Sequence, residues 1–131
     1  MLSDFQLLAE FRHQLRMFMV FSENAARAVG LAPQQHQALL AIKGFSGGGA
    51  PTVGDLAQQL AIRHHSAVGL ADRLVEARLL VRNIDASDRR KTTLVLTKRA
   101  EKLLTALSAT HRDELRRTGP LLRNVLARLE H

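Results

Sequence analysis

The spacing of the apolar residues changes twice along this chain, and these changes limit the folds that it can form. Up to residue 77, leucine, alanine and phenylalanine recur at steps of three and four residues, which is typical of amphipathic helices. Two short apolar runs at 79–82 and 92–96 then flank a polar, turn-prone segment, and this pattern predicts a β-hairpin. Helical spacing returns after residue 97. We therefore expect a mainly α-helical fold with one small β-hairpin.

Two short helices are predicted directly before the hairpin. Thr52 and Asp55 have the spacing of a capping box, which predicts a helix over 53–60. The next helix is predicted over 64–77, where one apolar face is formed by Ala67, Leu70, Ala71 and Leu74. Because only a short connection joins them, the two helices form a helix-turn-helix unit. A hairpin that directly follows such a unit is a wing.

A long helix is predicted over 4–29, ahead of this unit. Ser3 and Gln6 have capping-box spacing at its start, and Gly30 marks its end. Apolar side chains occupy more than one side of this helix, which a single chain of 131 residues rarely needs. A helical partner is therefore expected.

A shorter helix is predicted over 33–45, because Pro33 suits the first turn of a helix. A glycine-rich loop at 46–51 follows it. This loop resembles a phosphate loop only superficially, since no Gly-Lys-Ser/Thr sequence comes after it. Nucleotide binding is therefore not expected.

The C-terminal part is predicted to form two helices. Thr97 caps the first of them, over 98–117. The tripeptide Thr118-Gly119-Pro120 is expected to break this helix, because proline has no backbone N–H to donate. A last helix is predicted over 121–129.

The distribution of charge indicates a polyanionic partner. The chain carries a formal net charge of +7, of which +5 falls within residues 63–102 and only +2 on the rest. A local basic excess of this kind is typical of a nucleic-acid footprint.

Several classes of protein are excluded or not expected. The chain has no cysteine, so disulfides, thiol catalysis and cysteine zinc sites are excluded. No catalytic arrangement of residues emerges, and neither an enzyme nor a cofactor is expected. No apolar run reaches the roughly 18 residues of a membrane span. The first four residues lack a basic region, so no signal peptide is expected and the cytoplasm is the default location.

The segment from Leu56 to Thr97 resembles the core of the MarR family of winged helix-turn-helix regulators. The resemblance is carried in order by Leu56-Ala57-Gln58-Gln59-Leu60, Ala71-Asp72-Arg73-Leu74-Val75-Glu76, Asp85-Ala86-Ser87-Asp88-Arg89-Arg90 and Leu94-Val95-Leu96-Thr97. It implies one domain over 1–131, with a DNA-binding lobe at 31–97 and dimerisation helices within 1–30 and 98–131. It also implies a sequence-specific transcriptional regulator, more commonly a repressor, that acts as a homodimer.

Three positions depart from the family pattern. Ala61, Arg78 and Ala100 stand where the family often has glycine. A left-handed backbone at Arg78 would cost on the order of 1 kcal/mol without glycine. Arg63 also replaces a small polar residue at the start of the second short helix, so a weaker cap is expected there.

Candidate DNA contacts lie on that second short helix and on the wing. The helix presents one polar face opposite its apolar face, formed by Arg63, His64, His65, Ser66 and Gly69. One of the two histidines is expected to face DNA and the other to be partly packed. Arg73 either pairs with Asp72 and braces the helix, or reaches a phosphate.

The wing tip supplies the second set, Asp88, Arg89, Arg90 and Lys91. By resemblance to the family, Arg90 enters or skirts the minor groove and Asp88 orients its guanidinium. The enhanced negative potential of a narrow minor groove attracts arginine.

Dimerisation is expected to involve apolar stripes on the first and last helices, formed by Phe11, Leu15, Phe18, Leu103, Leu104, Leu107, Leu122, Val125 and Leu129. A symmetric dimer would read an inverted repeat. The family resemblance also implies a small aromatic or anionic effector, for which the candidate residues are His13, Arg16, Met17 and His36.

No metal site is expected. His64 and His65 are adjacent, so on a helix they point about 100° apart and cannot readily share one ion. His36 and His111 are expected to be isolated from each other. The alternative to a specific regulator is a winged-helix module that binds a protein, or DNA without sequence preference. The ratio of specific to nonspecific affinity at fixed salt would separate a specific regulator from a nonspecific DNA binder. An acidic or neutral wing would favour the protein-binding module, whereas this wing is basic.

Overall fold

The computed structural model describes residues 2–88 and 90–130, and this part of the chain forms five helices and one antiparallel hairpin. Their order is α1 (Asp4–Ala28), α2 (Pro33–Lys43), α3 (Val53–Leu60), α4 (His64–Glu76), β1 (Leu80–Ile84), β2 (Thr92–Leu96) and α5 (Lys98–Leu129). The expected helix-turn-helix unit, α3 and α4, and the wing that follows it are confirmed. Within the described residues, no helix has the length and apolarity needed to cross a bilayer.

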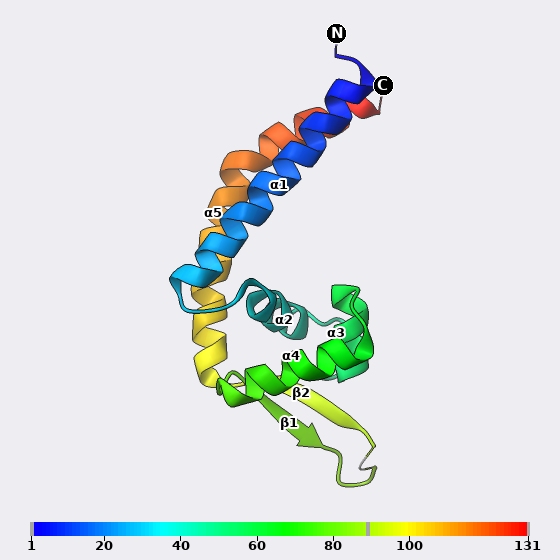
Figure 1. Cartoon of the computed structure of the whole chain (residues 1–131), viewed down its shortest axis with the longest axis vertical. Coiled ribbons are helices and arrows are strands. Elements are labelled where there is room, and N and C mark those ends of the chain that lie inside the picture. Colours follow the sequence, from blue (N-terminus) through cyan, green and yellow to red (C-terminus); the bar gives the residue numbers. More distant parts are fainter. Residues whose placement is uncertain (1, 89, 131) are drawn as a thin grey trace.

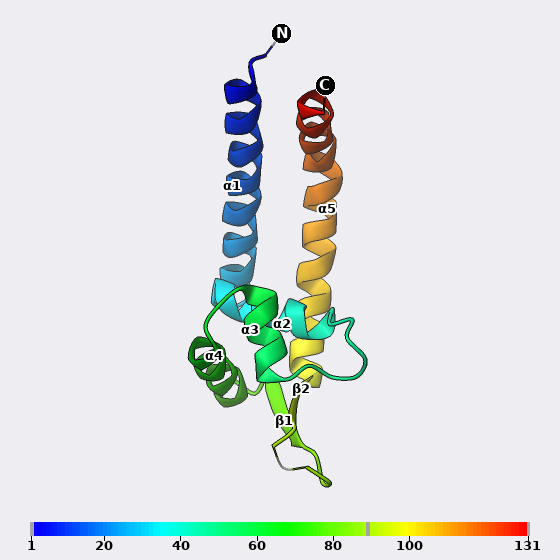
Figure 2. The ribbon, with the colours of Figure 1, turned by 90° about the vertical axis from the view of Figure 1, so that its right-hand side faces the viewer.

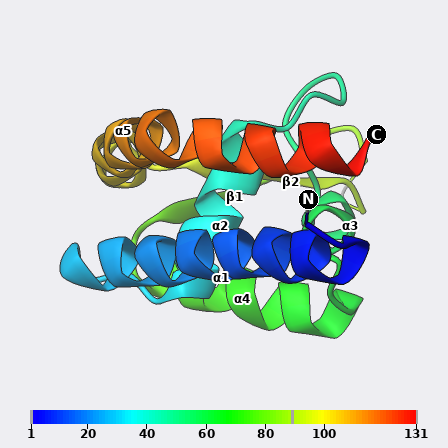
Figure 3. The ribbon, with the colours of Figure 1, turned by 90° about the horizontal axis from the view of Figure 1, so that it is seen from above.

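The molecule has two parts, a long helical pair and a small lobe. Figures 1 and 2 show α1 and α5 side by side, extending away from the lobe formed by α2, α3, α4 and the hairpin. The wing lies at the end of the molecule opposite the two chain termini. Viewed from above, α2 runs between α1 and α5 (Figure 3). Helix α2 contacts both of them, so it joins the helical pair to the lobe.

Leucine fills the core of the lobe. The largest fully buried side chains are Leu39, Leu56, Leu70, Leu74, Leu79, Leu80 and Leu94. Every residue of the predicted apolar face of α4 is buried. Each buried leucine contributes about 1.5–3 kcal/mol relative to exposure, so this face determines which side of α4 stays free.

Local capping signals set the helix starts as predicted. Ser3 and Gln6 form a complete capping box on α1, and Thr52 and Asp55 form one on α3. The Thr97 hydroxyl accepts a hydrogen bond of 3.2 Å from the backbone N–H of Ala100 at the start of α5. The predicted boundaries of α1, α2, α4 and β1 are each shifted by one or two residues.

The hairpin is attached to the lobe through its second strand. β1 and β2 pair in register from Leu80 with Leu96 to Ile84 with Thr92. The N–H of Leu94 also donates to the Pro51 carbonyl at 2.8 Å, next to a bridge between Thr52 and Thr93. The segment that begins α3 thereby fixes the base of the wing.

The predicted break in the C-terminal helix is wrong, because α5 continues from Lys98 to Leu129 with Pro120 inside it. Proline at this position costs about 3 kcal/mol in an isolated helix. Leu104 and Leu107 before the proline and Val125 after it are all buried, and α5 packs along α1. Burial of this one face requires a continuous helix, which bends along its length (Figure 1).

Two residues other than glycine adopt the left-handed backbone conformation. Ala61 has a φ of 55° at the end of α3, and Arg78 has a φ of 60° just after α4. These are two of the three positions at which glycine was noted as missing. The chain therefore keeps the expected turns and accepts about 1–2 kcal/mol of strain at each.

Candidate nucleic-acid interface

The polar face of α4 is free, as the sequence predicts. Arg63 is the N-cap residue and makes no side-chain cap hydrogen bond, so its weak capping is confirmed. Arg63, His64, His65 and Ser66 are exposed, and Gly69 is half-buried. The first turn of α4 contains no acidic residue. The positive end of the helix dipole therefore faces solvent without a neutralising carboxylate from its own first turn.

The expectation that one of the two adjacent histidines is partly packed is wrong. His64 and His65 are both exposed. Ala67 and Leu70 occupy the inward side of the first turns of α4, and this leaves no interior position for either imidazole.

The suggested pair between Asp72 and Arg73 does not form. Asp72 instead accepts a hydrogen bond from the guanidinium of Arg82 on β1. This ion pair joins α4 to the wing, but both side chains are partly exposed, so it contributes at most about 1 kcal/mol. Arg73 Nη1 lies 3.5 Å from the position that a Cβ on Gly69 would occupy. A Cβ at this position would make only an ordinary van der Waals contact with Arg73, and a phosphate contact by Arg73 stays a prediction.

Acidic side chains order the wing tip. Asp88 Oδ1 accepts hydrogen bonds from the backbone N–H of Arg90 at 3.1 Å and from its Nε at 3.2 Å. Asp85 accepts from the N–H of Ser87 at 2.8 Å and from its hydroxyl at 2.7 Å. These bonds lower the pKa of Asp85, chiefly through the Ser87 hydroxyl.

The cations of the wing tip project from this ordered turn. The Arg90 side chain is 93% exposed, and Lys91 is exposed as well. Asp88 and Arg90 have the relative position that the family resemblance implies. Arg89, which was predicted to contact DNA, lies outside the described residues.

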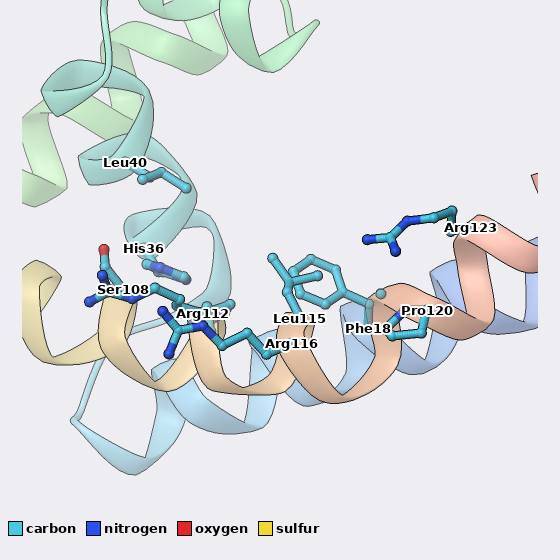
Figure 4. Close-up of a pocket in the computed structure, with 11 residues that line it drawn as sticks. Phe18, His36, Leu40, Ser108, Arg112, Leu115, Arg116, Pro120 and Arg123 are labelled. Carbon is cyan, nitrogen blue, oxygen red and sulfur yellow. The ribbon is translucent and has the colours of Figure 1, made fainter.

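A cavity of about 600 Å³ lies where α1, α2 and α5 meet (Figure 4). Its apolar wall includes Phe18, Leu40 and Leu115, and its basic residues are Arg112, Arg116 and Arg123. No aspartate or glutamate is among the described residues that line it. The cavity therefore offers an apolar surface beside several guanidinium groups, which suits an organic anion.

His36 and His111 are not isolated, contrary to expectation. Their ring centroids are 4.9 Å apart beside this cavity, and His36 is only 4% exposed. His111 Nδ1 donates to the Leu107 carbonyl at 2.7 Å, and its Nε2 lies 2.8 Å from the Ser22 hydroxyl. Burial, and to a smaller extent the charge of His111, lowers the pKa of His36.

Of the four effector candidates, only His36 lines this cavity. His13 and Arg16 are exposed on α1 and line none of the described cavities. Met17 lines a separate cavity of about 350 Å³ between α1 and α5. The three cavity arginines were missed, although their spacing of four and seven residues places them on one face of a helix that continues through Pro120.

The nine predicted dimer residues fall into two groups. Leu104, Leu107 and Val125 are buried within the single chain, so their apolar character is explained without a partner. Leu15 is exposed, and the half-buried members are Phe11, Phe18, Leu103, Leu122 and Leu129. Further exposed apolar residues on the helical pair are Phe5, Leu8, Met17, Met19, Val20, Leu115, Leu121 and Leu126.

A helix-turn-helix unit with a basic hairpin, carried on two long helices, defines a winged helix-turn-helix protein. Residues 29–91 match the model of the MarR family. This segment is just under half of the chain, and over it the chain is similar to this family.

Solved structures show the same fold. AbsC from Streptomyces coelicolor, a MarR family transcriptional regulator, is 24% identical with a TM-score of 0.71, over 89% of this chain and 80% of AbsC. A mutant of Staphylococcus aureus MepR bound to an oligodeoxyribonucleotide is 20% identical with a TM-score of 0.70, over 91% of each chain. CouR from Rhodococcus jostii bound to p-coumaroyl-CoA is 22% identical with a TM-score of 0.67, over 87% of this chain and 82% of CouR. A comparison with curated protein sequences gives no match.

Proposed function

We propose that this chain is a sequence-specific transcriptional regulator that binds duplex DNA as a homodimer and represses transcription. One observation carries the proposal. The exposed polar face of α4 and the exposed cations Arg90 and Lys91 belong to the same small lobe, at the end of the molecule away from the long helical pair. A helix of this kind fits the major groove while a basic wing reaches the adjacent groove or backbone. The similarity to the DNA-bound MepR mutant supports this arrangement.

The dimer is proposed from the apolar surface of α1 and α5. Phe5 is 86% exposed, and Leu8 and Leu121 are about half exposed on the same helical pair. Exposed apolar patches of this kind mark interaction sites. A twofold dimer through residues 1–30 and 98–131 would leave the lobes at 31–97 free to bind two half-sites. The operator would then be an inverted repeat with half-sites about 10 base pairs apart.

The test is selection of bound sequences from a random duplex pool at about 150 mM salt. Recovery of an inverted repeat would support a specific dimeric regulator. Binding without any enriched sequence would support an architectural, nonspecific DNA binder. No binding to DNA would favour a winged-helix module whose partner is a protein. Repression is tested separately by placing the recovered operator upstream of a reporter gene in the presence and absence of the protein.

We further propose that an organic anion in the cavity of about 600 Å³ regulates DNA binding. Arg112, Arg116 and Arg123 would pair with its acidic group, while Phe18 and Leu40 would pack on its apolar part. CouR, which was solved with p-coumaroyl-CoA, supports a ligand of this chemistry. The test is a panel of aromatic carboxylates and thioesters, assayed for release of the operator. Arg116→Gln should abolish the response, and Arg128→Gln, outside the cavity lining, is the matched control.

A further inference from the structure

The segment that leaves α4 is tied to the start of α5 by three hydrogen bonds. Arg99 Nη1 donates to the Ala77 carbonyl at 2.6 Å. The Thr97 hydroxyl donates to the Arg78 carbonyl at 2.8 Å, and the Thr97 backbone N–H donates to the Leu79 carbonyl at 3.2 Å. Three consecutive carbonyls thus accept from two residues, Arg99 in α5 and its N-cap Thr97. We call this set of bonds the α4–α5 clasp.

The clasp forms at the C-terminal end of α4, where backbone carbonyls have no hydrogen-bond donor within the helix. A helix leaves its last carbonyls without intrahelical donors. The N–H groups of Arg78 and Leu79 turn back to Val75 and Leu74 at 3.0 and 2.9 Å, which satisfies two of these carbonyls. The carbonyls of Ala77, Arg78 and Leu79 follow the last residue of α4, and these are the ones that the clasp takes up.

Thr97 joins the two helix ends through one hydroxyl group. Its oxygen accepts from the N–H of Ala100 at 3.2 Å, which caps α5. An amide N–H can only donate, so the hydroxyl hydrogen is directed to the Arg78 carbonyl at the end of α4. The Arg99 guanidinium adds a positive charge at the negative end of the α4 dipole.

The backbone at this point is strained and is held in place by its surroundings. Arg78 has a φ of 60°. A left-handed residue with a side chain persists when neighbouring contacts determine its conformation, and the clasp supplies such contacts. The direction in which the chain leaves α4 is therefore fixed relative to α5.

We propose that Thr97 and Arg99 are positioning residues that set the orientation of α4 relative to α5. This inference rests on the proposed function for its consequence at DNA, because α4 is the helix that would enter the major groove. In a dimer joined through α1 and α5, the clasp then determines the separation and tilt of the two α4 helices. It makes the dimer selective for one spacing of the half-sites.

The first test measures the α4–α5 geometry without DNA. Because the chain has no cysteine, spin labels can be placed at His65→Cys on α4 and Lys102→Cys on α5, both at exposed positions. The labelled protein is diluted in unlabelled protein, and the distance distribution between the labels is recorded. Arg99→Met and Thr97→Val should broaden the distribution, and Thr97→Ser should keep it narrow. Lys98→Met is the matched control, since Lys98 is exposed and takes no part in the clasp.

The second test uses unlabelled protein and the operator recovered by selection, with its spacer lengthened or shortened by one base pair. The reference protein and Lys98→Met should discriminate against the altered spacers by about tenfold, which corresponds to about 1.4 kcal/mol. Arg99→Met should lose most of this discrimination. A variant that only lowers stability would shift the melting temperature and leave both the distance distribution and the spacer preference unchanged.

Two results would overturn the inference. One is an unchanged distance distribution in both Arg99→Met and Thr97→Val. The other is a loss of spacer discrimination in Lys98→Met that equals the loss in Arg99→Met, which would identify a simple effect of charge. If selection recovers no operator, the proposed function fails, and the distance measurement still decides whether the clasp positions α4.

Discussion

Replacing Arg90 by alanine is expected to weaken binding to the operator by about 1–3 kcal/mol, which is about five- to 150-fold in Kd. The Arg90 side chain is 93% exposed, so its removal loses no packing. The bond that it makes to Asp88 is an exposed ion pair, and such pairs contribute about 0–1 kcal/mol. The free energy of unfolding should therefore stay within about 1 kcal/mol, and the loss should appear only in DNA binding.

The assay is a titration of operator DNA at several salt concentrations. If Arg90 contacts a phosphate or the minor groove, the slope of log K against log salt should fall by about 1. Arg128→Ala is the control, because Arg128 is an exposed arginine in the last turn of α5 and its replacement removes the same charge. Asp88→Ala should weaken binding less than Arg90→Ala, since Asp88 acts indirectly, by ordering the turn and orienting the arginine. If Arg90→Ala and Arg128→Ala bind within twofold of each other, the proposed role of the wing is wrong.

Three further outcomes are expected. Leu15 is 42% exposed, so Leu15→Asp should give a folded monomer in sedimentation, and a dimeric Leu15→Asp would contradict the proposed interface. Leu107 is 2% exposed in the core, so Leu107→Asp should unfold the chain, as measured by circular dichroism. Ala61→Gly should raise the free energy of unfolding by about 0.5–1 kcal/mol in urea titrations. Glycine removes the left-handed strain in the folded state, and the entropy that it adds to the unfolded chain offsets part of this gain. A loss of stability would refute the strain argument. Because the pKa of His36 is lowered in the folded state, the unfolded chain takes up the proton first as the pH falls. Stability should therefore be fully present above about pH 6.5 and decline below it, and His36→Gln should show a shallower decline between pH 7.5 and 5.5; equal declines would exclude this linkage.

The elements that the sequence predicts correctly are those with local signals. The capping boxes at Ser3 and Thr52 and the apolar face of α4 each lie within one helix and depend on neighbours a few residues away. The left-handed backbone at Arg78 was also predictable, because the family pattern places glycine there. The wing tip was found for the same reason, since its acids and cations are adjacent in the chain.

The parts that the sequence did not predict depend on contacts between distant segments. The local effect of Pro120 favours a break, but the packing of α5 along α1 is worth more than the lost hydrogen bond. His36 and His111 meet only because α2 runs between α1 and α5. The cavity arginines could not be grouped while α5 was predicted as two helices.

Pro120 does not end α5, but it lowers the resistance of the helix to bending at this turn. Pro120 donates no N–H to the Arg116 carbonyl, so this turn resists bending less than its neighbours do. The clasp lies on one side of this joint and the exposed Leu121 and Leu126 lie on the other, while Gly119 and Pro120 themselves line the cavity. A molecule that fills the cavity would therefore contact the turn at Gly119 and Pro120, where the two halves of α5 meet. Amide hydrogen exchange should be faster at residues 117–119 and 121 than in either adjoining part of α5.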